Sequence, residues 1–194
     1  MNSPYDFIVK PFNESYDNEV SVGDKSLIVN TTIENHRFVS KRAVVVSVPT
    51  AYSSPIKCGD EVYIHHNIFR RWYDQKGRER NSSRYFKNDM YFCGPDQIYM
   101  YNNKSHLDYC FVKPLDNRSY LHTRREQPYE GIIHTCPNNN RVKVDDYVVF
   151  KPDSEFEFII DGVKLYCMRL NEIVLNYGCY KDKAEDYRVS TKSS

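Results

Sequence analysis

The sequence repeats itself, because four short blocks of similar residues occur twice in the same order. The offset between the two copies is 103, 88, 86 and 75 residues at successive blocks, so it shrinks along the chain. Repeated blocks of this kind predict two copies of one small fold, the second with shorter loops. The four pairs are 5–12 with 108–115, 44–49 with 132–137, 56–64 with 142–150, and 97–100 with 172–175.

The blocks have the composition of β-strands. Short runs of β-branched and aromatic residues alternate with polar, proline and glycine residues, and no segment has a sustained apolar period of 3.6. Asp161-Gly162 lies between two apolar runs and predicts a two-residue hairpin turn. We therefore expect an all-β protein, and short strands at this spacing favour small barrels. The expected strands are 7–9, 43–48, 61–64, 89–92, 98–101, 109–112, 131–135, 147–150, 156–160, 163–168 and 173–176.

The repeat also predicts the domain organisation. We expect a first domain over 1–103, a second over 104–179 and a polar tail over 180–194. Each half of the 194-residue chain has about 95 residues, which is enough for a modest core.

Two long loops interrupt the first domain. Residues 13–40 are mostly polar but contain the aliphatic run Leu27-Ile28-Val29. Residues 70–87 form a basic insertion, with seven Lys or Arg residues against Asp74 and Glu79. Loops of this length in a compact domain are usually functional or disordered.

Charge and cysteine content narrow the classes of partner. The formal net charge is +1 at pH 7, so the overall charge of the chain does not indicate a nucleic-acid partner. None of the six cysteines belongs to a CxxC pair, which argues against a zinc site. No apolar stretch is long enough to span a membrane and no signal peptide is visible. We expect a soluble, cytoplasmic protein without a membrane partner.

The ordered set of motifs resembles the GroES-like co-chaperonin family. The second copy carries the closer match, and the first copy keeps only the Gly-Asp turn at 59–60 and the closing strand at 98–100. The matching stretches of the second copy are 111–114 (FVKP), 131–133 (GII), 142–150 (VKVDDYVVF), 166–168 (YCM) and 171–175 (NEIVL).

This resemblance implies two tandem, small GroES-like irregular β-barrels. It implies a lid that caps a chaperonin double ring, encloses an unfolded client protein and assists ATP-dependent folding without catalysis or a cofactor. In the family a long mobile loop after the first strand docks on the chaperonin. Residues 13–40 take that place, and Leu27, Ile28 and Val29 are the expected chaperonin-binding residues. The second copy has a shorter loop at this place.

The resemblance further implies a homo-oligomeric ring. In the family the closing strand of one subunit pairs with the opening strand of its neighbour. The expected interface residues therefore lie on the opening and closing strands of both copies. They are Phe7, Ile8, Val9, Ile98, Tyr99, Met100, Tyr109, Phe111, Ile173, Val174 and Leu175.

Other interpretations stay open from the residues alone. Residues 27–29 also fit an ordinary strand of the barrel. The whole chain also fits a structural component of a virion or another large assembly. A weaker alternative is a nucleic-acid-binding module, since the 70–87 insertion interleaves arginines with aromatic residues. The purely structural interpretation of the insertion is a solvated hairpin whose aromatic rings cap the barrel. Its aromatic residues are Trp72, Tyr73, Tyr85 and Phe86.

Catalytic and metal sites are not expected. His65 and His66 are adjacent, so on a strand their rings would point to opposite faces and could not chelate one ion together. No Ser/His/Asp constellation and no glycine-rich phosphate loop is recognisable. We therefore expect no enzymatic activity, no metal and no catalytic residue.

Overall fold

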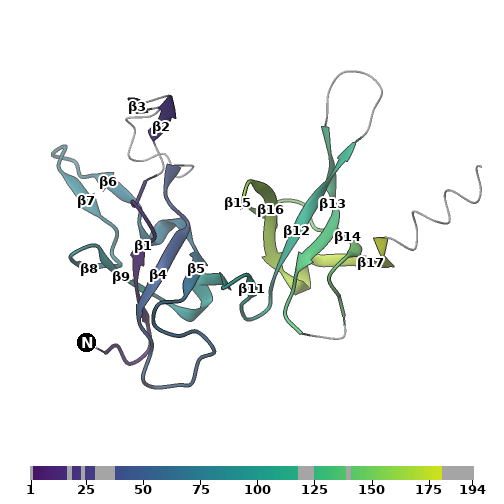
Figure 1. Ribbon diagram of the computed structural model, residues 1–194, viewed down its shortest axis with the longest axis horizontal. Coiled ribbons are helices and arrows are strands. Elements are labelled where there is room, and N and C mark those ends of the chain that lie inside the picture. Colours follow the sequence, from purple (N-terminus) through teal and green to yellow (C-terminus); the bar gives the residue numbers. More distant parts are fainter. Residues whose placement is uncertain are drawn as a thin grey trace, which may run out of the picture. The chain divides into compact units, whose positions relative to one another are not determined.

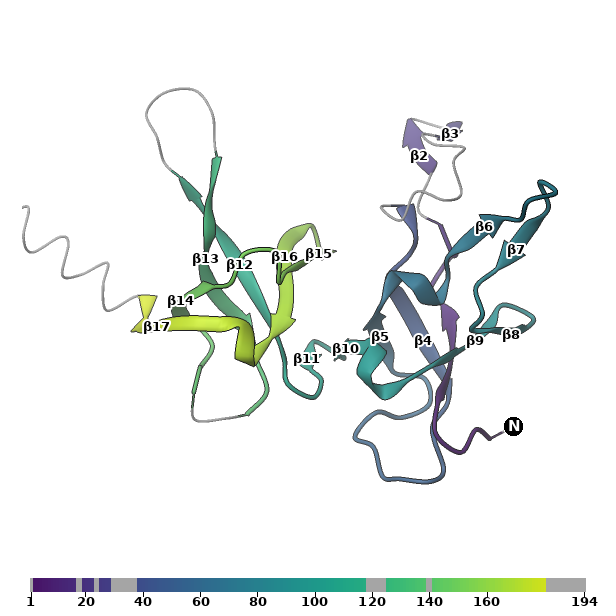
Figure 2. The same cartoon turned by 180° about the vertical axis from the view of Figure 1, so that it is seen from behind.

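The computed structural model describes residues 2–16, 19–22, 25–28, 38–117, 125–138 and 141–180. The chain is all-β, with antiparallel strands and short 3-10 helices, and it divides into two compact units, Met1–Asn102 and Asn103–Ser194 (Figures 1 and 2). Each unit is described by itself.

The strands of the first unit lie in a seven-stranded sheet with the order β11-β10-β5-β4-β1-β9-β8, whose edge strand β11 comes just after the boundary at Asn102. Two further strand pairs, β2–β3 and β6–β7, form small sheets of their own. The 3-10 helices η2 (His66–Ile68) and η3 (Pro95–Gln97) precede β6 and β10. The strands are β1 (Phe7–Pro11), β2 (Glu19–Val22), β3 (Lys25–Ile28), β4 (Arg42–Ser47), β5 (Glu61–Ile64), β6 (Arg71–Tyr73), β7 (Glu79–Asn81), β8 (Tyr85–Lys87), β9 (Met90–Cys93), β10 (Ile98–Tyr101) and β11 (Lys104–Ser105).

The second unit has one six-stranded sheet with the order β15-β16-β12-β13-β14-β17. The 3-10 helix η4 (Leu170–Glu172) precedes the last strand. The Asp161-Gly162 turn joins β15 to β16, with Ile160 opposite Val163 and both turn residues at positive φ, as predicted. The strands are β12 (Tyr109–Asn117), β13 (Arg125–Thr135), β14 (Asp146–Phe150), β15 (Phe156–Ile160), β16 (Val163–Arg169) and β17 (Ile173–Cys179).

The two units share one strand order. The run β10-β5-β4-β1-β9-β8 in the first unit corresponds, position by position, to β17-β14-β13-β12-β16-β15 in the second. The residue register is shared as well. Ile8 lies opposite Ser47 in the first unit, and Phe111 lies opposite Thr135 in the second, which are the positions related by the sequence offsets of 103 and 88. In both units a register shift follows that pair.

The turn before the third shared strand is also the same in both units. The Asp60 carboxylate accepts a hydrogen bond from the Lys57 amide at 2.7 Å, and the Asp146 carboxylate accepts one from the Lys143 amide at 2.9 Å. The residue before each aspartate has a positive φ, +88° at Gly59 and +71° at Asp145. This backbone conformation suits glycine, and aspartate tolerates it better than most residues.

Each unit has its own hydrophobic core, because inward positions of its strands carry apolar side chains. β14 shows this alternation most simply, with Val148 and Phe150 buried and their neighbours half-exposed. The two sheets are open rather than closed, since their outermost strands, β11 and β8 or β15 and β17, are not hydrogen-bonded to each other in the described residues. The structure therefore shows the all-β class but not the closure of two barrels.

Candidate binding surfaces

The expected chaperonin-binding run lies partly in β3. Leu27 and Ile28 pair with Val20 and Glu19 of β2, and Val29 lies outside the described residues. The β2–β3 pair is a sheet of its own and adds no strand to the seven-stranded sheet of the first unit. Figures 1 and 2 show it beyond the ends of β1 and β4. Residues 25–28 are thus a strand, but not a strand of the main sheet.

The expected interface residues on the opening strands are buried inside their own units. Phe7, Ile8 and Val9 of β1 are buried, as are Tyr109 and Phe111 of β12. β1 is hydrogen-bonded to β4 on one side and to β9 on the other, and β12 likewise lies between β13 and β16. Both backbone edges of each opening strand are therefore occupied within its unit.

The closing strands differ sharply in exposure, although they occupy matching positions. In β10, Ile98, Tyr99 and Met100 are all buried, with 2% of Met100 exposed. In β17, Val174 is 57% exposed and Leu175 is 47% exposed. β17 forms the end of its sheet, where β14 is its only pairing partner in the described residues, whereas β10 lies between β5 and β11. The second unit therefore presents an apolar strand with a free backbone edge.

Tyrosine side chains pack across the β14–β17 pair. The Tyr147 ring stacks on the Tyr177 ring with centroids 5.2 Å apart, and Tyr180 meets Tyr147 edge-on at 6.1 Å. The Tyr147 hydroxyl donates a hydrogen bond to the Glu130 carboxylate at 2.5 Å. Burial, then the hydrogen bond and charge of Glu130, raises the pKa of Tyr147 to about 12. Tyr147 therefore stays neutral, as a tyrosine in a packed interface does.

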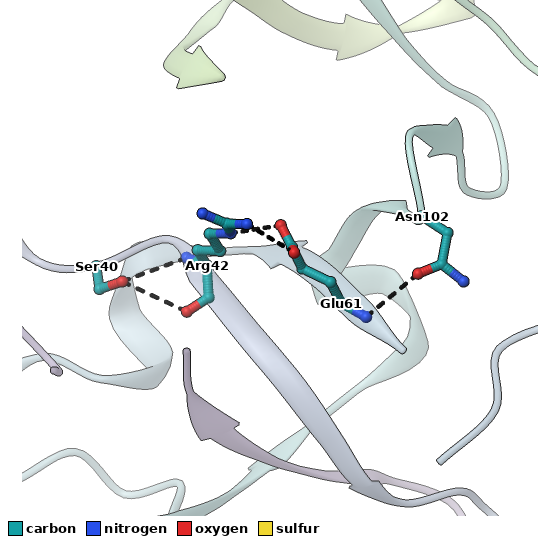
Figure 3. A network of polar contacts seen from close by, with 4 residues as sticks. All are labelled: Ser40, Arg42, Glu61 and Asn102. Carbon is teal, nitrogen blue, oxygen red and sulfur yellow. Dashed lines mark hydrogen bonds and ion pairs between the residues drawn. The ribbon is translucent and has the colours of Figure 1, made fainter. Parts of the chain in front are cut away.

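The matching place in the first unit holds an ion pair (Figure 3). The Arg42 guanidinium donates two hydrogen bonds to the Glu61 carboxylate, the one from Nη2 measuring 2.7 Å. Its carbon lies 3.8 Å from the centre of the Phe12 ring. The Asn102 side chain accepts from the Glu61 amide at 3.3 Å, and the Ser40 hydroxyl contacts the Arg42 backbone. Such a partly exposed pair links β4 to β5 and stabilises a protein by about 0–1 kcal/mol.

The basic insertion folds as two short hairpin segments. β6 and β7 pair with each other, so that Trp72 lies opposite Arg80. β8 pairs with β9 at the edge of the seven-stranded sheet. The four aromatic side chains are partly exposed, and the Tyr85 ring also packs against the buried Tyr91. Their exposed fractions are 45% for Trp72, 48% for Tyr73, 38% for Tyr85 and 38% for Phe86.

The two adjacent histidines are not on opposite faces, so that prediction was wrong. The rings of His65 and His66 stack with centroids 4.4 Å apart and an angle of 24° between their planes. The strand alternation does not apply because β5 ends at Ile64 and η2 begins at His66. Burial lowers the pKa of His65 below 6.5, against an opposing effect of Asp96. Among the described residues, no three His, Cys, Asp or Glu side chains gather as a metal-binding group.

Comparison of the sequence with protein-family models gives no match, and comparison with curated proteins gives none either. Within the described ranges, no helix has the length and apolar character needed to cross a bilayer.

Proposed function

We propose that the protein is a non-catalytic co-chaperonin. In this proposal it is built from two tandem GroES-like barrels, caps a chaperonin double ring and encloses an unfolded client during ATP-dependent folding. The observation that carries the proposal is the β2–β3 pair, which forms a sheet of its own and lies between β1 and β4 in the sequence. β1 and β4 belong to the repeated framework, since β12 and β13 pair in the same register. The ordered motifs of the GroES-like family support the same conclusion.

The β2–β3 pair is suited to reversible docking. A two-stranded hairpin without further strands is only marginally stable in water. Little stability is therefore lost when it rearranges on a partner. Residues 27–29 are aliphatic in the sequence, and each such side chain that becomes buried on a partner contributes about 1.5–3 kcal/mol.

A single docking arm, by which we mean the segment 13–40 that contains β2 and β3, would bind weakly. Fixing about ten residues costs about 1–2 kcal/mol for each residue, which offsets the gain from three aliphatic side chains. Several arms on one ring bind together, because each later contact is intramolecular. The proposal therefore requires that the chain form a ring.

The free edge of β17 provides a surface for ring formation. An apolar edge strand with unpaired backbone groups is a template for a strand of another chain. Val174 and Leu175 are exposed here, whereas their counterparts Tyr99 and Met100 are buried. In the ring, a neighbouring chain covers β17. Because both edges of β1 are occupied, the neighbouring chain covers β17 with a segment other than its opening strand.

The test is to mix the protein with a chaperonin and ATP and to look for capped particles by electron microscopy. The native chain is expected to cap, and a variant with Leu27, Ile28 and Val29 changed to serine is expected to lose capping. A matched control changes three exposed aliphatic residues outside the arm to serine and is expected to cap like the native chain. The control residues are Val46, Leu107 and Val144. Equal capping by the arm variant would refute the assigned contact.

A structural component of a virion or another large assembly is the second candidate. The observation that favours it is the exposed apolar surface on both edge strands of the second unit. Ile159 of β15 is exposed, as are Val174 and Leu175 of β17. Absence of capping, together with concentration-dependent assembly of the chain alone, would support this candidate over the lid.

A further inference from the structure

The part of the basic insertion that precedes β8, residues 70–84, is not required by the fold. The first unit uses residues 65–84 to connect β5 to β8, whereas the second unit connects the matching strands, β14 and β15, with residues 151–155. Both units nevertheless have the same strand order. The β6–β7 hairpin and its flanking residues are thus an addition to a framework that folds without them.

The insertion concentrates positive charge on a chain that is otherwise acidic. It holds seven Lys or Arg residues and two acidic residues, a net charge of +5. Because the whole chain has a formal net charge of +1, the remaining residues carry −4. The insertion is therefore a positively charged region that attracts polyanions.

Most of these cations have no acidic partner among the described residues. Arg71 pairs with Glu79 at 2.7 Å and Arg80 pairs with Asp74 at 3.0 Å. Lys87 lies over the Phe86 ring, with its nitrogen 5.0 Å from the ring centre. The other four side chains form no ion pair within the part of the chain that the structure describes. These four are Arg70, Lys76, Arg78 and Arg84.

Aromatic rings are interleaved with these cations and are held at the surface. Tyr85 packs edge-on against Tyr91 at 5.3 Å, and Phe86 lies 5.2 Å from Phe92, so one side of each ring is supported by the sheet. Trp72 faces Arg80 across the β6–β7 pair. Figures 1 and 2 show β6, β7 and β8 on the β9 side of the first unit.

The base of the insertion is anchored to the first unit. The Arg71 amide donates a hydrogen bond to the Tyr16 hydroxyl at 2.7 Å, and the Arg71 guanidinium lies over the Tyr16 ring. The Ser82 hydroxyl donates to the Ile68 carbonyl at 2.6 Å. These contacts fix both ends of the hairpin, so its side chains are arranged before a ligand arrives.

We propose that residues 70–87 bind single-stranded nucleic acid, a function that goes beyond the proposed lid and does not depend on it. Exposed aromatic rings offer stacking surfaces to bases, and the unpaired cations neutralise the phosphates between them. An acidic protein surface would use the cations but would leave the stacking surface of Trp72 without a matching chemical group. The combination of rings and cations therefore favours nucleic acid over an acidic protein.

The test uses the native full-length chain and a labelled oligothymidylate of about twelve nucleotides, a length within the usual range of such sites. Trp72 is the only tryptophan of the chain, so its fluorescence reports directly on the site. We expect saturable quenching of Trp72 and an affinity that falls as salt rises, with a slope of about −0.7 for each phosphate neutralised.

Three variants separate the contributions. Replacing Arg70, Arg78 and Arg84 with glutamine is expected to reduce the salt slope by about two. Trp72→Ala lacks the tryptophan signal, so its binding is followed through the label on the oligonucleotide. This variant is expected to bind about fivefold or more weakly with an unchanged salt slope. The matched control removes three exposed lysines outside the insertion and is expected to bind like the native chain. These lysines are Lys57, Lys104 and Lys143.

Any of three results would overturn the proposal. One is the absence of Trp72 quenching by the oligonucleotide at low salt. Another is equal loss of affinity in the arginine variant and the lysine control. Inorganic polyphosphate is the probe for charge alone. If it bound as tightly as the oligonucleotide and Trp72→Ala had no effect, the insertion would be an unspecific anion surface and the proposal would also fail. Far-UV circular dichroism checks that each variant retains the β-sheet spectrum.

Discussion

We expect Gly131→Ala to destabilise the second unit, because no space exists there for a methyl group. A Cβ atom built at Gly131 would lie 2.5 Å from the backbone oxygen of Lys113 and 2.5 Å from Cγ1 of Val112. Since one of these atoms belongs to the backbone of the paired strand, β12 and β13 must move apart. Overpacking of this kind costs about 1–3 kcal/mol, which lowers the melting temperature of a small domain by roughly 5–20 °C.

The first unit supplies an internal control. Ala43 occupies the matching position, where it lies opposite Pro11 as Gly131 lies opposite Pro114, and its methyl group is accommodated in the core. The reverse change, Ala43→Gly, removes a buried methyl group and adds backbone freedom. We expect it to destabilise the first unit by about 1–2 kcal/mol.

Native-state hydrogen exchange measures the two effects separately, because it reports protection segment by segment. In Gly131→Ala, peptides from β12 and β13 are expected to exchange about 5- to 150-fold faster, which corresponds to 1–3 kcal/mol. Exchange of β12 and β13 at the native rate, or a loss of protection confined to β1 and β4, would refute the reasoning.

Further predictions concern titration and thiol reactivity. Tyr147→Phe is expected to remove the last tyrosine step from the phenolate absorbance titration, because the folded pKa is about 12. The stability from this neutral tyrosine is complete below pH 10 and is lost as pH rises towards 12, so an unchanged titration curve would contradict the assignment. Burial lowers the pKa of His65 and His106 below 6.5. The unfolded chain then takes up protons first, and the urea midpoint is expected to fall as pH drops below about 6.5. His106→Gln is expected to weaken that pH dependence, and an equally steep fall would argue against a contribution from His106. With Ellman's reagent, Cys58→Ser is expected to remove the fastest phase of native labelling, since Cys58 is exposed. Three buried thiols, whose pKa values burial raises, are expected to react only after unfolding, and their labelling in the native state would contradict this. They are Cys93, Cys110 and Cys167.

Short-range signals made the shared framework predictable. The apolar blocks lie on β1, β4, β5 and β10 and on their counterparts, because each block carries its own alternation and its own turn. Asp161-Gly162 needs only two residues to specify a hairpin. The shared register agrees with the repeat, since adding 103 to positions of β1 and 88 to positions of β4 gives the paired positions of β12 and β13.

Long-range packing was not predictable. Glu79–Asn81 is a strand without apolar residues, because β7 is held by its pairing with β6 rather than by burial. Ile98-Tyr99-Met100 and Ile173-Val174-Leu175 look equivalent as sequences, yet the first is buried and the second largely exposed. Burial depends on what covers a strand, and neighbouring residues in the sequence do not specify that.

The shared register means that this one chain contains a two-member alignment of its own fold. Lys57 and Lys143, like Asp60 and Asp146, mark positions where both copies use the same residue for the same backbone hydrogen bond. Where the copies diverge, as at Arg42 and Glu130, the framework accepts either side chain. A substitution at a position of the shared framework can therefore be judged against a natural precedent in the other half, without any second protein.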